Sequence, residues 1–116
     1  MNSHIQTSVV IPVYNEVESL KPLIDRLLPT LESLGSHEVI FVNDGSLDGS
    51  AQVLEDMTEV YPGIVKVIHL RGNKGKSLAL QAGFQAVSGK CVVMMDADLQ
   101  DRPEEIPSLL KHLKEN

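Results

Sequence analysis

The chain has 116 residues, a formal charge of −6 at neutral pH and an apolar content of 42%. This length predicts one domain with a substantial core, whereas the negative charge and an aromatic content of only 3% argue against a nucleic-acid partner. A single cysteine, Cys91, excludes an internal disulfide, and no apolar stretch approaches the ~20 residues that span a bilayer. We therefore expect a soluble, cytoplasmic chain from a reducing compartment.

Strand and helix patterns alternate along the sequence. Apolar and β-branched runs predict four strands, over residues 8–13, 38–43, 64–70 and 91–96. Apolar residues at helical spacing predict helices over residues 17–34, around Val53, Leu54, Met57 and Val60, over residues 76–87, and from Pro103 onward, the last burying Ile106, Leu109, Leu110 and Leu113. We expect Pro29 to kink or break the first helix, and Ser46 or Asp48 to cap the second.

This alternation predicts an α/β fold with a Rossmann-like parallel sheet. Right-handed crossovers place the carboxyl ends of all parallel strands at one edge, so the loops that follow the strands gather there. A strand order of 3-2-1-4 would reverse the chain direction between the first and fourth strands and open a crevice at that edge. We expect the functional site in this crevice, beside Tyr14 and Asp96.

Two carboxylates separated by one residue follow the fourth strand, in Asp96-Ala97-Asp98. The preceding run, residues 91–95, has no polar face, which predicts a strand in the buried centre of the sheet. Carboxylate oxygens and substrate phosphates together suit Mg²⁺ or Mn²⁺, and a nucleotide diphosphate could not settle among these negative charges without such a cation. A turn or a helix cap is the alternative explanation of the triplet.

The other loops at this edge carry further polar residues. Asp44 is placed to accept a hydrogen bond from a nucleobase N–H, and Gly45 allows a tight turn beside a ligand, although Asp44 could instead form an Asx-turn. Tyr14 could line a nucleotide site or pack on the sheet edge. Glu16 could line the same site or stabilise a helix N-terminus. Lys74 and Lys76 could contact phosphate or belong to a solvated basic loop.

Four segments of the chain resemble the family 2 glycosyltransferases. In order they read VVIPVYNE (9–16), VNDGSLDG (42–49), RGNKGKS (71–77) and DADLQDRPEEIP (96–107). The part of the last segment from residue 99 to residue 107 is similar to the branch that transfers sugars to polyprenyl phosphates, such as dolichyl-phosphate mannose synthase and the bacterial undecaprenyl-phosphate sugar transferases.

The resemblance implies the nucleotide-binding half of a GT-A fold. It also implies a UDP- or GDP-sugar donor, a Mg²⁺ or Mn²⁺ ion, and transfer with inversion to a polyprenyl phosphate or a saccharide. The implied donor-site residues are Pro12, Tyr14, Asn15, Glu16, Asp44, Gly45, Lys76, Asp96 and Ala97. The implied metal ligands are Asp96, Asp98 and Gln100.

Catalytic domains of this family are about twice as long as this chain, because the fold needs a donor half and an acceptor half. The resemblance therefore implies that residues 1–116 are the N-terminal nucleotide-sugar-binding part of a catalytic domain. The acceptor half, any catalytic base and any membrane helices would follow Asn116, and the longer protein would work in the cytoplasm or at the cytoplasmic face of a membrane. We expect the uncovered side of the sheet to favour self-association into a homo-oligomer.

Proteins of other classes share parts of this pattern. A catalytically silent nucleotide-binding module would bind the donor without turnover. A receiver-type signalling domain has a similar length and Mg²⁺-binding carboxylates, but it needs acidic residues directly after the first strand and an Asp after the third. Those places here hold Tyr14-Asn15-Glu16 and Leu70-Arg71-Gly72, which argues against this class. A nucleotidyltransferase would begin with a Gly-rich, basic loop that residues 12–15 do not resemble.

Overall fold

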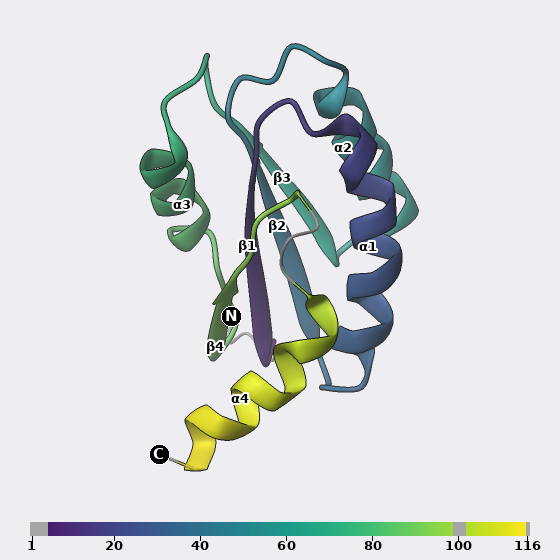
Figure 1. Ribbon diagram of the computed structural model, residues 1–116, viewed down its shortest axis with the longest axis vertical. Coiled ribbons are helices and arrows are strands. Elements are labelled where there is room, and N and C mark those ends of the chain that lie inside the picture. Colours follow the sequence, from purple (N-terminus) through teal and green to yellow (C-terminus); the bar gives the residue numbers. More distant parts are fainter. Residues whose placement is uncertain (1–4, 99–101, 116) are drawn as a thin grey trace.

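The computed structural model describes residues 5–98 and 102–115, with side chains described to residue 111. Its centre is a four-stranded parallel sheet, which confirms the predicted fold class, and its order β3-β2-β1-β4 is the one that the expected crevice requires (Figure 1). The strands are β1 (Thr7–Val13), β2 (His37–Asn43), β3 (Val65–His69) and β4 (Cys91–Met94). The helices are α1 (Val17–Glu32), α2 (Ser50–Val60), α3 (Lys76–Phe84), the short 3-10 helix η1 (Pro103–Glu105) and α4 (Ile106–Glu115).

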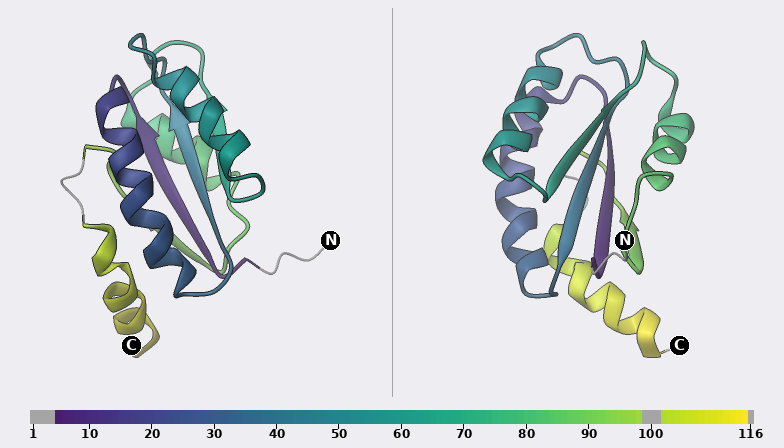
Figure 2. Two further views of the ribbon diagram at one scale, coloured as in Figure 1. Left: turned by 90° about the vertical axis from the view of Figure 1, so that its right-hand side faces the viewer. Right: turned by 180° about the vertical axis from the view of Figure 1, so that it is seen from behind.

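Helices cover the two faces of the sheet unequally, as Figures 1 and 2 show. On one face, α1, α2 and the start of α4 enclose the larger core cluster, in which Phe41 and Leu27 are fully buried. On the other face α3 packs alone over β1 and β2. Gly83 makes this approach possible, because a Cβ atom there would lie 3.1 Å from Val42 Cγ2 and closer still to Val10. Within the described part of the chain, no helix has the length and apolarity needed to cross a membrane.

The first helix runs without a break through both of its prolines. Pro22 and Pro29 lie inside α1, so of the predicted kink or break at Pro29 the break is wrong, and the kink stays a prediction. Both prolines are on the exposed side of the helix, where carbonyl groups that lose an N–H partner can bind water instead. The opposite side packs apolar residues into the core, and this packing holds the helix together.

The fourth strand lies at the edge of the described sheet, so the prediction that it occupies the buried centre is wrong. Only β1 pairs with it, and α3 covers β1 and β2 rather than β4. Val93 is therefore buried beneath α1 and η1, whereas Val92 and Met94 are 41% and 57% exposed on the other face. An apolar run does not reveal which of its two faces has a neighbour.

The last two helices also differ in detail from the predictions. The third helix, α3, ends at Phe84 rather than Val87. In α4, Ile106 and Leu110 are buried as expected, but Leu109 is 52% exposed. Leu113 lies beyond the side chains that the structure describes.

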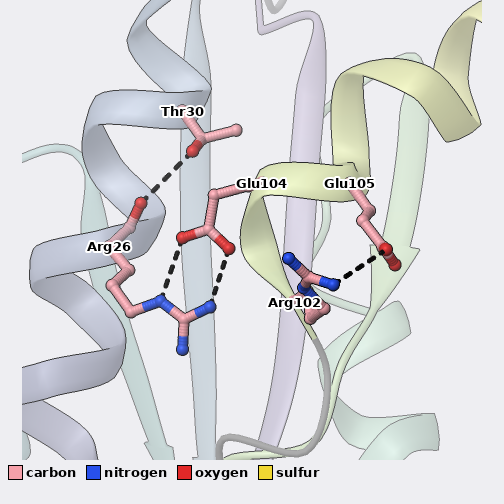
Figure 3. A network of polar contacts seen from close by, with 5 residues as sticks. All are labelled: Arg26, Thr30, Arg102, Glu104 and Glu105. Carbon is pink, nitrogen blue, oxygen red and sulfur yellow. Dashed lines mark hydrogen bonds and ion pairs between the residues drawn. The ribbon is translucent and has the colours of Figure 1, made fainter.

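An ion pair fastens the C-terminal segment to the first helix. Arg26 on α1 donates two hydrogen bonds to Glu104 on η1, from Nε to Oε2 at 2.9 Å and from Nη2 to Oε1 at 2.7 Å (Figure 3). This bidentate geometry is the strongest arrangement between these two groups. It holds the start of the last helical segment beside α1, on the face of the sheet opposite α3.

Candidate functional site

A cleft of about 430 Å³ opens at the carboxyl edge of the sheet, as the strand order predicts. Its walls come from the ends of β1, β2 and β4 and from the loop that leads into α3. The lining residues are Pro12, Val13, Tyr14, Glu16, Asp44, Asn73, Gly75, Lys76, Asp96 and Asp98. Residues that the sequence singled out in separate loops therefore lie around one cavity.

Asp44 holds the loop that leads into α3. Its side chain is almost fully buried, and its two carboxylate oxygens accept hydrogen bonds from Lys74 N at 2.6 Å and Gly75 N at 3.0 Å. The local bond from side chain to backbone at this turn belongs instead to Asn43, whose Oδ1 accepts the Ser46 N–H at 3.0 Å. Asp44 thus positions one wall of the cleft, and the role of its carboxylate toward a nucleobase stays a prediction.

Gly45 allows two loops to approach closely. It adopts a φ of +76°, and a Cβ atom there would lie 2.6 Å from Asn73 N and 2.7 Å from Gly72 O. Real Cβ atoms do not come so near to backbone atoms, so only glycine fits without moving the loop. Gly45 lies behind the cleft wall rather than on it, and its predicted effect on ligand binding would act through this loop.

Asn15 joins the first loop of the site to the second. Its Oδ1 accepts the Leu47 N–H at 2.7 Å, and its own N–H donates to Ser46 Oγ at 2.9 Å. These two bonds hold Asn15 in a left-handed conformation with a φ of 53°, which Asn tolerates better than most residues. The side chain therefore faces the neighbouring loop and does not line the cleft.

The predicted caps of the second helix are wrong. Gly49, with a φ of 95°, occupies the N-cap position of α2, and no side chain caps it. Asp48 Oδ1 accepts both the N–H and the hydroxyl of Ser50, while Oδ2 accepts the Val17 N–H at the start of α1. The hydroxyl of Ser50 is the main reason why the pKa of Asp48 lies below its usual range. Asp48 thus links the starts of two helices instead of capping one.

Negative charge accumulates in the cleft. Burial raises the pKa of Glu16 above its usual value despite a stabilising hydrogen bond from the Tyr14 N–H, and the charges of Asp98 and Asp96 add to the increase. In the wall of the cleft, Lys76 Nζ lies 2.5 Å from Asp96 Oδ1. A cation would relieve the repulsion among these carboxylates.

The carboxylates suit a hard divalent cation only in part. Oxygen donors such as Asp96 and Asp98 are the ligands that Mg²⁺ and Mn²⁺ prefer, and Mg²⁺ commonly uses one or two carboxylates together with substrate phosphates and water. Among the described residues, no three His, Cys, Asp or Glu side chains are placed to hold a metal on their own. Gln100, the third predicted ligand, lies outside the described residues. The donor set therefore fits a cation that a phosphate ligand completes.

Ala97 separates the two carboxylates and is itself buried, with 1% of its surface exposed. It packs in the larger core cluster, so the backbone on either side of it is fixed. This anchoring turns Asp96 and Asp98 toward the cleft. A direct contact of Ala97 with a nucleotide stays a prediction.

Sequence analysis missed three residues of the cleft. Val13 ends the first strand, so its apolar side chain was expected in the core. Asn73 and Gly75 lie in a loop whose lysines are the more obvious candidates for a phosphate contact. Gly75 has a φ of 98°, and its position between the third strand and a helix was the available signal. The hydrogen bond from its N–H to Asp44 joins loops far apart in sequence, which no local pattern reveals.

Comparison with known proteins identifies the family and the fold of the chain. The family model described as glycosyl transferase family 2 matches residues 8–116. A mannosyltransferase from Pyrobaculum calidifontis, PcManGT, solved in complex with GDP-Man and Mn²⁺, is 26% identical, with a TM-score of 0.73 over 80% of this chain and 27% of its own. Glucosyl-3-phosphoglycerate synthase from Mycobacterium tuberculosis, solved with Mn²⁺, UDP and glucosyl-3-phosphoglycerate, is 27% identical, with a TM-score of 0.71 over 95% of this chain and 40% of its own.

A third protein supports the fold alone. TarS from S. aureus, in a fragment solved in complex with UDP-GlcNAc, is 24% identical, with a TM-score of 0.73 over 96% of this chain and 32% of its own. The chain thus spans well under half of the length of each of these solved proteins. All three share the α/β fold of this chain.

Proposed function

Since the chain belongs to glycosyl transferase family 2, we propose that its cleft binds the nucleotide diphosphate of a UDP- or GDP-sugar together with Mg²⁺ or Mn²⁺. The main observation in support is that Asp44, Asp96 and Asp98 line one cavity of about 430 Å³, a volume in the range of small-ligand sites. Two similar proteins were solved with Mn²⁺ and with GDP-Man or UDP, which supports both parts of the proposal.

The proposed roles follow the position of each residue. Tyr14 and Pro12 form one wall for the nucleoside, with Glu16 beside them, and Asp44 lies at the base end of the cleft. Lys76 contacts the diphosphate, while Asp96 lies between ribose and metal. Gly45, Asn15 and Ala97 act through the loops that they hold. The proposed metal ligands are Asp96, Asp98 and Gln100.

The proposed reaction is transfer of the sugar to an acceptor with inversion at the anomeric carbon. A bound divalent cation would stabilise the departing nucleotide diphosphate as a Lewis acid. The protein holds the donor so that an acceptor oxygen attacks opposite the leaving group. A hydroxyl acceptor needs a base to remove its proton, whereas a phosphate acceptor is already ionised and needs mainly positioning.

We propose a polyprenyl phosphate as the acceptor. The similarity of the segment 99–107 to that branch of the family supports this choice, and a saccharide is the alternative. A solved complex of the mycobacterial synthase contains phosphoglyceric acid, so an anionic acceptor occurs among similar proteins. Residues 1–116 would supply the donor part of the catalytic domain and further sequence the acceptor part.

A silent nucleotide-binding module is the second candidate. The observation in its favour is coverage, because the chain corresponds to only 27% of the mannosyltransferase and 40% of the synthase. Such a module would bind donor and metal as proposed but would not transfer sugar to any acceptor. Binding and turnover must therefore be measured separately.

Calorimetric titration with UDP and with GDP, each with and without Mn²⁺, tests the proposed site. We expect one nucleotide to bind only when Mn²⁺ is present and Asp98→Asn to abolish this binding. Asp56→Asn is the matched control, because Asp56 lies exposed on α2, outside the cleft, and should leave the binding unchanged. Absence of binding by the folded wild-type chain would refute a donor site in residues 1–116.

A further inference from the structure

An ion pair between Lys76 and Asp96 lies in the wall of the proposed donor cleft. Lys76 is the first residue of α3 and Asp96 follows the end of β4, so the pair joins two of the elements that line the cavity. The Nζ to Oδ1 distance is 2.5 Å, and the two side chains are 61% and 41% exposed. Both groups can therefore exchange this contact for another without unfolding their surroundings.

Helix electrostatics do not explain a lysine at this place. The N-terminus of a helix carries a partial positive charge, so a cation there is unfavourable, and the first turn of α3 contains no acidic residue to balance it. An exposed ion pair also contributes little to stability. The placement of Lys76 is better explained by the carboxylates that it faces in the cleft.

A lysine ammonium and a divalent cation would compete for Asp96. Glu16, Asp96 and Asp98 bring negative charge into one cavity, and the ammonium of Lys76 compensates part of it. A metal ion that takes an oxygen of Asp96 must weaken the contact with Lys76. A diphosphate would lower the cost of this step, because its oxygens give the ammonium a new partner on the same side of the cleft.

We propose that Lys76 is an exchangeable counter-cation, which holds Asp96 while the cleft contains no donor and moves to the diphosphate when donor and metal enter. The exchange couples the two binding events: metal alone binds weakly, and the nucleotide diphosphate strengthens its binding. By linkage, metal strengthens nucleotide binding by the same factor. This inference depends on the proposed function, because it requires the same cleft to hold a nucleotide diphosphate and a cation.

Titration of Mn²⁺ alone, followed by electron paramagnetic resonance of the free ion, tests the exchange. We expect Lys76→Gln to bind Mn²⁺ alone roughly 2- to 5-fold more tightly than wild type, which corresponds to the loss of one exposed ion pair. In the presence of Mn²⁺ the same variant should bind the nucleotide roughly tenfold more weakly, since a charged contact to phosphate is lost. The two affinities therefore change in opposite directions.

Two further variants control this experiment. Lys74→Gln removes the same charge from the same loop, but the Lys74 side chain does not line the cleft, so neither affinity should change beyond measurement error. Lys76→Arg keeps the cation and should retain the weak binding of Mn²⁺ alone. Circular dichroism and thermal unfolding of all variants verify that each is folded, and the exposed pair predicts little change in Tm.

The outcomes separate the exchange from the proposed function. Unchanged or weaker binding of Mn²⁺ alone by Lys76→Gln, or an equal increase in Lys74→Gln, would overturn the exchange while wild-type nucleotide binding still supports the donor site. A wild-type chain that binds no nucleotide with Mn²⁺ would overturn both. Opposite changes in the two affinities, confined to Lys76→Gln, would establish the exchange.

Discussion

Carboxylates at the two edges of the sheet have opposite surroundings. At the amino edge, Glu38 is fully buried and accepts hydrogen bonds from Ser8 Oγ and Lys66 Nζ, each at 2.6 Å, and from Ser88 N at 2.7 Å. Burial raises the pKa of Glu38, but these three bonds outweigh it and hold the pKa below its usual value. At the carboxyl edge, burial and neighbouring carboxylates raise the pKa of Glu16.

This contrast distinguishes a structural carboxylate from one that can serve a ligand. The charge of Glu38 is compensated by partners within the chain, which join β1, β2, β3 and the segment before β4. The charges of Glu16, Asp96 and Asp98 lie close to one another, and the last two side chains reach solvent in the cleft. A carboxylate in a cavity whose pKa is raised, such as Glu16, indicates a binding site, whereas a fully buried carboxylate with three hydrogen-bond partners, such as Glu38, indicates a structural role.

Glu38→Ala should have the largest effect on stability. The substitution leaves the buried Ser8 hydroxyl and the Ser88 N–H without their acceptor, so we expect the free energy of unfolding to fall by about 3 kcal/mol. Urea denaturation measures this change, and nucleotide affinity of the folded fraction should not change. Glu32→Ala, at the exposed end of α1, is the control. A decrease in the free energy of unfolding of less than about 1 kcal/mol would show that Glu38 does not stabilise the packing of these strands.

Gly45→Ala and Gly72→Ala form a matched pair at the carboxyl edge. Both glycines have a positive φ, +76° and +66°, so alanine is strained at either position. Only at Gly45 would the new Cβ atom also collide with backbone. We expect Gly45→Ala to cost about 1–3 kcal/mol more than Gly72→Ala in the free energy of unfolding, and it alone should weaken nucleotide binding. Equal effects of the two substitutions would mean that the loop moves freely away from Gly45.

Glu16→Gln should give a small stability change of the opposite sign. Because the pKa of Glu16 is raised in the folded chain, its ionisation opposes folding, and this destabilisation develops as pH rises through the folded pKa. The variant should therefore have a higher Tm than wild type at pH 7, with the difference vanishing below the unfolded pKa of about 4.3. Thermal unfolding across this pH range measures the effect. A lower Tm of the variant than of wild type at pH 7 would show that burial and the neighbouring carboxylates do not disfavour the charge of Glu16.

Glu104 provides the smallest effect, as an exposed carboxylate with one strong partner. The hydrogen bonds from Arg26 lower the pKa of Glu104 to about 2 (Figure 3). Its contribution is present above the unfolded pKa and is lost as pH falls toward 2. Glu104→Gln should therefore unfold at a slightly lower temperature than wild type at pH 7 and at the same temperature near pH 2. Glu105→Gln, whose partner Arg102 lies 4.0 Å away, should show no such difference.

Repeating patterns carried most of the fold prediction. The alternation of strands and helices was sufficient for the parallel α/β sheet but not for its strand order, which the sequence offered only as a condition for the crevice. The observed order places Tyr14, Asp44 and Asp96 around one cleft. Burial of an apolar run was not predictable in the same way, because Val92 and Met94 are exposed only through the absence of a neighbour on one side of β4. The period of a strand reports its two faces, not what covers them.

The internal contacts of the site were beyond sequence reasoning. Asp44 binds Lys74 and Gly75, and Asn15 binds Leu47, across separations of about thirty residues, as the hydrogen-bond partners show. Such bonds depend on where two loops meet after the sheet has formed. The sequence identified the residue types that bind a ligand, while the structure shows which of them also hold the loops in place.

The pairing of the first strand with the fourth has a consequence for the order of folding. Thr7 pairs with Cys91 and Val10 with Met94, so this parallel contact joins the beginning of the chain to its last quarter. Such long-range pairing is slow to form, and during synthesis β1, β2 and β3 can associate before β4 has left the ribosome. Asp96 and Asp98 come after β4, so the carboxylates reach the cleft only when that strand docks. The carboxylate side of the proposed donor site is thus completed only after the first three strands have associated.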